Sequence, residues 1–257
     1  MSNAFKILDT NSFRLSKLSS TNDTSEAKPK IGVTEKAYEE KLSEIYDYFS
    51  KLNQKNIELA CFCKDSSKNA LLKTIPDNLK YDDYSGRGFA LPRMWAQYAE
   101  NNKGVCFIFN YEKIIESLNR IKPYIIKTGK VKYVKNFSCF SFESNQIDDI
   151  YDNITQHDGT LIGIEMLKNS KQFIDYNYFA KSSDWISENE YRILAFNDSN
   201  KNLTINNIKT VLEGIVVGEN TDDTDIDIIR LLCEKNKLKN NFDIKKISFN
   251  YQGCTIL

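Results

Sequence analysis

Two carboxylates and a guanidinium stand at alternate positions late in the chain, at Glu188, Glu190 and Arg192. The residues between and after them, Tyr191 and Ile193, favour a β-strand. Because side chains of a strand alternate between its faces, we expect the three charged groups on one face and the two apolar residues on the other, in a core. Carboxylates this close tend to differ in pKa, and a neighbouring arginine moderates the difference. The pattern predicts a polar site on this strand.

The same spacing has a simpler interpretation. Charges at alternate positions are also typical of a solvated strand face, on which they pair with one another and contribute little to stability. On spacing alone this interpretation is preferred, and spacing by itself does not identify a function.

Composition excludes several classes of function. The 257 residues include 35 Lys plus Arg and 35 Asp plus Glu, so the formal net charge is zero. A general binder of nucleic acid or of anionic membranes would show a basic excess. No apolar run approaches the ~18 residues of a membrane span, and the N-terminus lacks the apolar core of a signal peptide. We therefore expect a soluble, cytoplasmic protein without a membrane partner, and the net charge does not indicate a nucleic-acid partner.

The cysteines and the single histidine limit the chemistry further. All six cysteines are expected to be free thiols, and four of them stand in apolar runs, at Cys61, Cys63, Cys106 and Cys233. A zinc site usually needs paired Cys or Cys/His ligands, and the only histidine is His157. We expect no metal, and a nucleophile that depends on a histidine base is disfavoured.

The elements that must position these groups follow from hydrophobic patterning. A helix capped by Thr34 is expected, with an apolar stripe at Tyr38, Leu42, Ile45, Phe49 and Leu52. Strands are expected at residues 57–63, 105–109, 191–196 and 214–217. Residues 64–92, polar and rich in Gly, Pro, Asp and Asn, are expected to be a long loop or lid.

Further helices and strands complete the pattern. A short helix at 93–98 carries Met94, Trp95 and Tyr98, and we expect the Trp95 ring to be mostly buried. More helix is expected at 111–121, over most of 147–178 with a break near His157, and after a cap at Thr224. Residues 243–249 and 252–257 suggest two final strands. The order predicts an α+β fold in a single domain, 1–257, with a central mixed or antiparallel sheet flanked by helices.

Several segments carry a family resemblance. They are Leu15-Ser16 with Asn22, Asp23 and Glu26; Cys61-Phe62; residues 94–99; residues 103–106; Trp185 with Glu188, Glu190, Tyr191 and Arg192; and residues 212–218. Together they resemble an uncharacterised bacterial family known as domain of unknown function 2971. The family's usual Phe-Asn-Asp-Pro-Phe-Glu stands here as Thr21-Asn22-Asp23-Thr24-Ser25-Glu26. The family name supplies no chemistry.

A more distant similarity is to ADP-ribosyltransferase-like folds, whose late strand carries a catalytic glutamate, often within Glu-x-Glu. That similarity implies NAD as the nucleotide-like ligand, with Glu190 and Glu188 as catalytic residues. Breaking the nicotinamide–ribose bond develops oxocarbenium character, which a carboxylate stabilises. Arg14, Lys6 or Arg87 would hold the pyrophosphate, and Trp95 or Tyr98 would stack on a ring. The implied binding set is Arg14, Ser16, Asn22, Asp23, Arg87, Trp95, Tyr98 and Arg192, with residues 16–23 and the loop around Arg87 forming one wall of a cleft.

Two other classes stay open. In a non-enzymatic interaction module, Trp185, Glu190 and Arg192 would form a structural network that fixes the sheet. In a metal-dependent nuclease, Asn22 and Asp23 would join Glu188 and Glu190 as ligands. The sequence names no macromolecular target.

Overall fold

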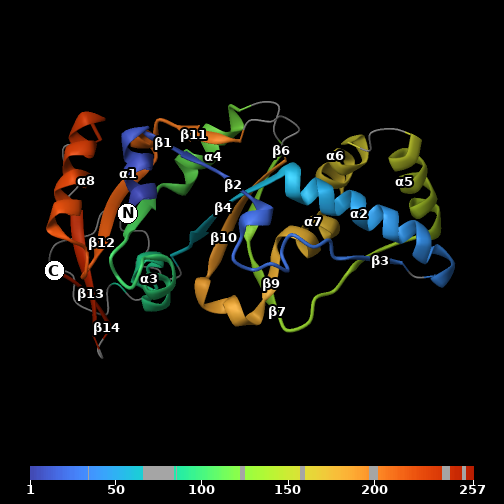
Figure 1. Ribbon diagram of the computed structural model, residues 1–257, viewed down its shortest axis with the longest axis horizontal. Coiled ribbons are helices and arrows are strands. Elements are labelled where there is room, and N and C mark those ends of the chain that lie inside the picture. Colours follow the sequence, from blue (N-terminus) through green and yellow to red (C-terminus); the bar gives the residue numbers. More distant parts are fainter. Residues whose placement is uncertain are drawn as a thin grey trace.

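Two four-stranded sheets form the framework of the molecule (Figure 1). The computed structural model describes residues 1–33, 35–65, 84, 86–121, 125–156, 160–196, 202–238, 244–250 and 253–257. The first sheet, in the order β2-β4-β10-β6, is antiparallel throughout. Its strands are β2 (Ser16–Lys17), β4 (Ile57–Cys63), β6 (Ile125–Lys130) and β10 (Glu190–Phe196).

The second sheet has the order β14-β13-β12-β5 and is mixed, because β12 and β13 are parallel while its other pairs are antiparallel. Its strands are β5 (Val105–Phe109), β12 (Leu212–Gly218), β13 (Ile244–Asn250) and β14 (Gly253–Ile256). Two-stranded pairs connect the rest: β1 (Ser12–Arg14) with β11 (Thr204–Asn206), β3 (Ile31–Val33) with β8 (Phe140–Phe142), and β7 (Lys132–Val134) with β9 (Ala180–Ser182).

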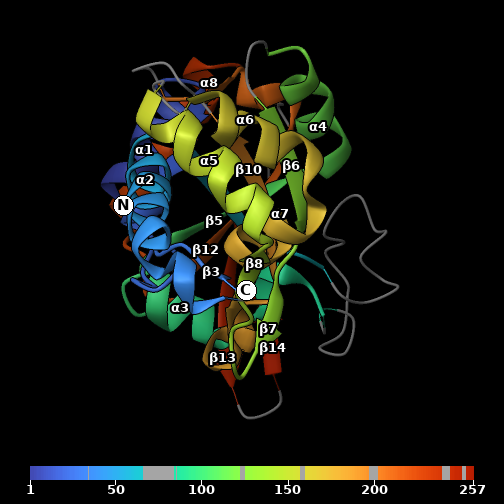
Figure 2. The same ribbon diagram turned by 90° about the vertical axis from the view of Figure 1, so that its right-hand side faces the viewer.

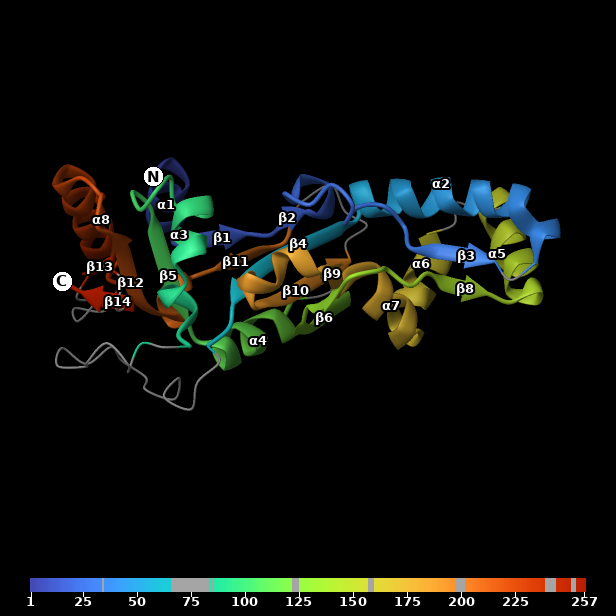
Figure 3. The same cartoon turned by 90° about the horizontal axis from the view of Figure 1, so that it is seen from below.

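Helices gather at both ends of this framework. The helices are α1 (Ser2–Asp9), α2 (Glu39–Lys55), α3 (Pro92–Tyr98), α4 (Tyr111–Asn119), α5 (Ser144–Gln156), α6 (Thr160–Asn169), α7 (Lys171–Tyr178) and α8 (Asp223–Lys235). Short 3-10 turns include η5 (Gly88–Ala90) and η6 (Ser183–Glu188). Figures 2 and 3 show α2, α5, α6 and α7 together at the end opposite the second sheet. Helix α7 begins where the Ser170 hydroxyl accepts a hydrogen bond from the Phe173 amide, a favourable N-cap.

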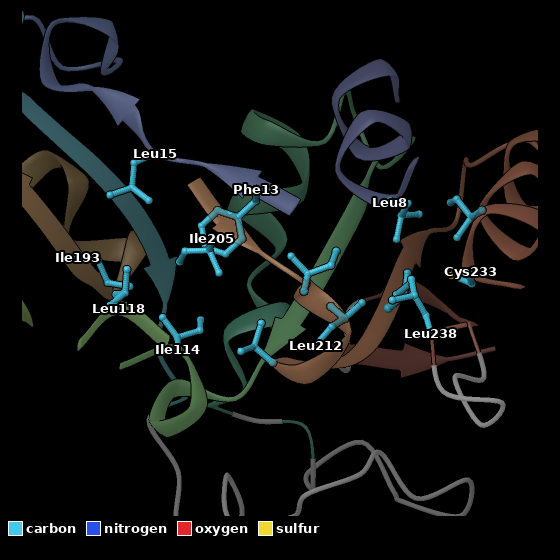
Figure 4. Close-up of a cluster of buried hydrophobic side chains, with 14 of the residues drawn as sticks. Leu8, Phe13, Leu15, Ile114, Leu118, Ile193, Ile205, Leu212, Cys233 and Leu238 are labelled. Atoms are coloured by element: carbon cyan, nitrogen blue, oxygen red, sulfur yellow. The ribbon is translucent and has the colours of Figure 1, made fainter. Parts of the chain in front are cut away.

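Strand β10 is buried on both faces, and this decides where the charged residues lie. Ile193 and Ala195 enter a core that also takes Leu212 and Ile215 from β12, so this core joins the two sheets (Figure 4). Leu194 and Phe196 enter a second core, in which they meet Phe49 of α2 and Phe173 of α7. Because faces alternate along a strand, Glu190 and Arg192 lie on the side of this second core.

The α+β class and all four expected strands are confirmed, but the expected single sheet containing them is wrong. Strand β10 has β4 and β6 as neighbours and β12 has β5 and β13, which leaves neither strand a free edge for the other. The expected helices are confirmed as α2 to α7, and the final hairpin as β13 and β14. The cap of α8 is Asp222 and not Thr224. The single-domain organisation stays a prediction.

Some expectations concern residues outside the described ranges, namely the Thr34 cap, the break at His157 and most of the loop 64–92. Trp95 is confirmed as a core residue, 3% exposed, and its indole N–H donates to the Phe89 carbonyl over 2.6 Å. Within the described ranges, every helix is too short or too polar to cross a membrane.

Candidate functional site

Glu190 and Arg192 share one face of β10, as predicted, but Glu188 does not belong to the strand. It ends η6, and Asn189 follows with a φ of 45°, in the left-handed region that asparagine tolerates better than most residues. That residue breaks the extended alternation, so the expectation of three charges on one strand face is wrong. The expected burial is confirmed for Ile193, whereas Tyr191 is half-buried and packs edge-on against Tyr111.

Arg192 is the centre of a buried hydrogen-bonded network and is 1% exposed. Its Nε donates to Glu190, one terminal nitrogen donates to both Glu190 and Glu26, and the other donates to the Tyr178 carbonyl. Burial alone would raise the pKa of Glu190, but the hydrogen bond and charge of Arg192 overcome it and hold that pKa below its ordinary value. This pair is therefore ionised across the ordinary pH range.

Lys181 connects the carboxylate of Glu188 to the network. It lies on β9, which pairs with β7 beside β10 (Figure 1), and its Nζ is 2.8 Å from Glu188 Oε2 and 3.4 Å from Glu190 Oε2. The ammonium also lies 4.6 Å from the centre of the Trp185 ring. Burial lowers the pKa of Lys181, but the hydrogen bond that it donates to Glu188 and the charges of the carboxylates raise it overall. Glu188 and Glu190 are thus held together by one cation.

Tyr98 of α3 reaches this network from the surface. Its side chain is 47% exposed, and its hydroxyl donates to Glu188 Oε1 over 2.5 Å. The Asn22 side chain hydrogen-bonds to the same hydroxyl, and burial and the bond to Glu188 raise the pKa of Tyr98 to about 12. Tyr133 lies opposite Lys181 in the β7–β9 pair, and its hydroxyl accepts a hydrogen bond from the Glu190 amide over 2.9 Å.

Cys61 lies at the surface beside the Glu190–Arg192 pair. It is opposite Arg192 in the β4–β10 register and hydrogen-bonds to Glu190. Its side chain is exposed to solvent, yet desolvation by surrounding protein, followed by the charge of Glu190, raises the pKa of the thiol strongly. Solvent therefore reaches the edge of the charge network at Cys61.

The six cysteines all lie in the described part of the chain and carry free thiols, as predicted. Although it stands in an apolar run, Cys61 is exposed, because on β4 it faces the charged end of β10 and not an apolar layer.

The segment before β3 contributes a third group of charges. Glu26 binds Arg192, and the buried Lys30 donates from its Nζ to the Asn177 carbonyl over 3.4 Å. Burial lowers the pKa of Lys30 to about 8, an effect that the nearby charge of Glu26 partly offsets. Asp23 accepts from Ser25 through one oxygen, and its buried second oxygen has no hydrogen-bond partner among the described residues.

The network carries a net negative charge. Its acids are Glu26, Glu188, Glu190 and Asp23, and its bases are Lys30, Lys181 and Arg192. Four negative groups against three positive ones leave one negative charge. Such a site favours a transition state in which positive charge develops next to its carboxylates.

The structure brings together only part of the binding set that the resemblance implied. Glu188, Glu190, Arg192, Tyr98 and Asn22 meet directly, and Asp23 is close enough to affect the pKa of Lys30. Sequence reasoning missed Lys181 and Lys30. Lys181 stands in an ordinary Ala-Lys-Ser strand, and its role follows from the β7–β9 pairing, which leaves no local signal.

Four other residues of that set lie apart from the network. Arg14 is exposed at the end of β1, and Ser16 is exposed on β2 opposite Leu59. Arg87 is buried beside Asp65, with 3.1 Å between its Nε and the carboxylate. The buried ring of Trp95 has no free face on which a ligand ring could stack. Lys6, the remaining pyrophosphate candidate, is exposed on α1.

The metal-dependent alternative finds no support in the geometry. Over the ranges that the structure describes, no three His, Cys, Asp or Glu side chains are grouped in a way that could hold a metal ion. In particular, the carboxylates of Glu188 and Glu190 are neutralised by Lys181 and Arg192, which occupy the positions that a cation would take.

Comparison with known proteins adds one finding. No curated protein and no solved structure matches the chain. Residues 94–193 match the model of a family described as "Protein of unknown function (DUF2971)". The match begins at Met94 in α3 and ends at Ile193 in β10, so it includes Tyr98, Lys181 and Arg192. Through the region that builds most of the charge network, the chain is similar to this family of unknown function.

Proposed function

We propose that the protein is an NAD-consuming enzyme of the ADP-ribosyltransferase-like kind, with the charge network as its site. The observation that supports this most is the convergence of Glu188 and Glu190 on Lys181, near the exposed thiol of Cys61. Residues from well-separated parts of the chain, 22–30, 61, 98 and 181–192, contribute to it.

Burying these charges costs free energy, which argues that the network has a role beyond packing. Removing ions from water costs several kcal/mol each by general estimates, and replacing a buried ion pair by apolar residues is often neutral or stabilising. Arg192, Lys181 and both glutamates are buried here, next to a thiol that water reaches. A purely structural connection between strands does not need such a site.

The two glutamates have different roles. Both oxygens of Glu190 are bound by Arg192 and Lys181, so this residue holds the cations in place. One oxygen of Glu188 is bound by the hydroxyl of the exposed Tyr98, which a ribose hydroxyl of a substrate can replace. We therefore assign Glu188 as the carboxylate that meets the substrate.

The chemistry suits the charge of the site. When the bond between C1′ of the ribose and the nicotinamide nitrogen breaks, its electron pair leaves with nicotinamide and positive charge develops on the ribose. The buried carboxylate of Glu188 stabilises that charge, and Lys181, 2.8 Å from its Oε2, holds the carboxylate in place. Water is the simplest acceptor for the ribosyl group.

One observation favours the non-enzymatic alternative. Each guanidinium nitrogen of Arg192 donates to an acceptor within the protein, as expected of a structural network. In that case the network fixes β10 against α7 and the segment around Glu26, and no substrate is involved.

The substitution Glu188→Gln separates the two functions, with Glu44→Gln as its matched control. Glu44 also accepts a tyrosine hydroxyl, that of Tyr151, but at an exposed position. An enzyme is expected to release nicotinamide from NAD in the wild type and in Glu44→Gln, and to lose at least 100-fold of that rate in Glu188→Gln. A wild type that releases no nicotinamide, or a Glu188→Gln variant with full rate, contradicts the proposal.

A further inference from the structure

We propose that Asn220 is a positioning residue of this site, which holds Tyr98 against Glu188 through a left-handed turn at residues 100–102. The proposal deepens the function proposed above, but it depends only on the geometry of the Tyr98–Glu188 contact. Asn220 lies in the connection between β12 and α8, and its bonds reach the turn that follows α3.

The turn is conformationally strained. Glu100, Asn101 and Asn102 have φ values of 48°, 57° and 67°. L-residues visit this region as isolated residues, because Cβ comes too close to the following carbonyl. Three successive non-glycine residues there persist only if their surroundings hold them, and such strain concentrates at functional sites.

The connection after β12 supplies what holds the turn. The Asn220 side-chain amide donates to the Asn101 carbonyl over 3.1 Å, and its backbone amide donates to the Asn102 carbonyl over 3.0 Å. The Asn102 side chain donates in turn to Glu219 over 3.2 Å. A Cβ at Gly218 would lie 2.1 Å from the Asn102 carbonyl oxygen, so only glycine allows this close approach.

The turn fixes the direction of Tyr98. It begins two residues after Tyr98, and the amides of Asn102 and Lys103 donate back to the carbonyls of Trp95 and Ala99. Trp95 anchors the other side of the same helical turn in the core. The last turn of α3 is thus held from both sides, and from it the largely exposed Tyr98 side chain extends to the buried Glu188.

A loosened turn has a defined consequence for the site. Without the Asn220 side chain, the strained residues can relax toward ordinary conformations and carry the end of α3 away from Glu188. Glu188 then loses the Tyr98 hydroxyl, and this loosens a network that extends through Lys181 and Glu190 to Cys61. Cys61 can therefore report on the turn, although Asn220 is on another element.

The experiment measures alkylation of individual thiols by mass spectrometry in the full chain without NAD. The thiol of Cys139, which is also exposed, is the internal control. Asn220→Ala and the isosteric Asn220→Asp, which lacks the donor, are expected to raise the Cys61 rate at least threefold while the Cys139 rate stays constant. Tyr98→Phe, which removes the hydroxyl directly, should raise the Cys61 rate equally.

A rescue variant distinguishes positioning from loss of stability. Adding Glu100→Gly to Asn220→Ala relieves strain at the turn itself and should return the Cys61 rate toward that of the wild type. An unchanged Cys61 rate in the Asn220 variants, or equal increases at both thiols, would overturn the proposal. Because the alkylation assay contains no NAD, its result does not depend on NAD turnover. The role of Asn220 can therefore be contradicted while the proposed function holds, or hold while the proposed function is contradicted.

Discussion

At the scale of single residues, the protein buries several ionisable groups. They differ in how far hydrogen bonds and opposite charges offset the cost of that burial. Arg192 and Lys181 have carboxylate partners, whose charges and hydrogen bonds raise the pKa of each despite burial. Lys30 lies near the same carboxylates, but the acceptor of its ammonium is the Asn177 carbonyl, 3.4 Å away. Its charge is therefore the least compensated of the three.

The pKa of Lys30 predicts a pH dependence of stability. Burial lowers this pKa to about 8 in the folded protein, from 10.5 in a solvated lysine. Between these values the unfolded chain binds a proton that the folded chain does not, so Lys30 makes the free energy of unfolding rise with pH. Relative to Lys30→Met, the wild type should gain about 2–3 kcal/mol between pH 7.5 and 10.

The measurement is a series of denaturant titrations of both proteins over that range, with the exposed Lys28→Met as control. The difference between curves is needed because thiols act in the opposite direction. Burial raises the pKa of Cys63 to about 12 from 9.0, so stability falls above pH 9 for that group. Parallel curves for wild type and Lys30→Met would contradict the assignment.

At the scale of elements, the sequence predicts what is local. Strands β4 and β5 have the predicted ends because their apolar and β-branched runs are bounded by turn residues. The division into two sheets was not predictable, since pairing partners far apart in sequence leave no local pattern. For the same reason the sequence does not predict the role of Lys181, which depends on the parallel β7–β9 pair. Glu188 was placed wrongly because strand alternation was extended past Asn189, where the backbone is left-handed.

The left-handed turn after α3 gives an element-scale prediction. Glu100 is 76% exposed and lies 3.7 Å from the N-terminal amine, with a φ of 48°. Glu100→Gly and Glu100→Ala both remove this carboxylate, but only glycine adopts the conformation without strain. Glu100→Gly should therefore be more stable than Glu100→Ala by about 1 kcal/mol. Equal stabilities in thermal and denaturant unfolding would show that the turn is not strained.

At the scale of the whole molecule, the site lies where three layers meet. The core shared by the two sheets packs against one face of β10, and the helical core with α2 and α7 packs against the other. Helix α3 lies near the end of β10 that carries Glu190, where Tyr98 contacts Glu188. This arrangement explains how the network can be buried and still adjoin an exposed thiol. We propose that NAD binds at the exposed edge of this network, beside Cys61.

The most direct test is protection of Cys61 from alkylation by NAD, with Cys139 as the reference thiol in the same sample. If NAD binds beside Glu190 and Cys61, the Cys61 rate should fall at least threefold at saturating NAD and the Cys139 rate should not change. The protection should also be concentration-dependent and saturable. A Cys61 rate that is independent of NAD, or an equal decrease at both thiols, would contradict the account.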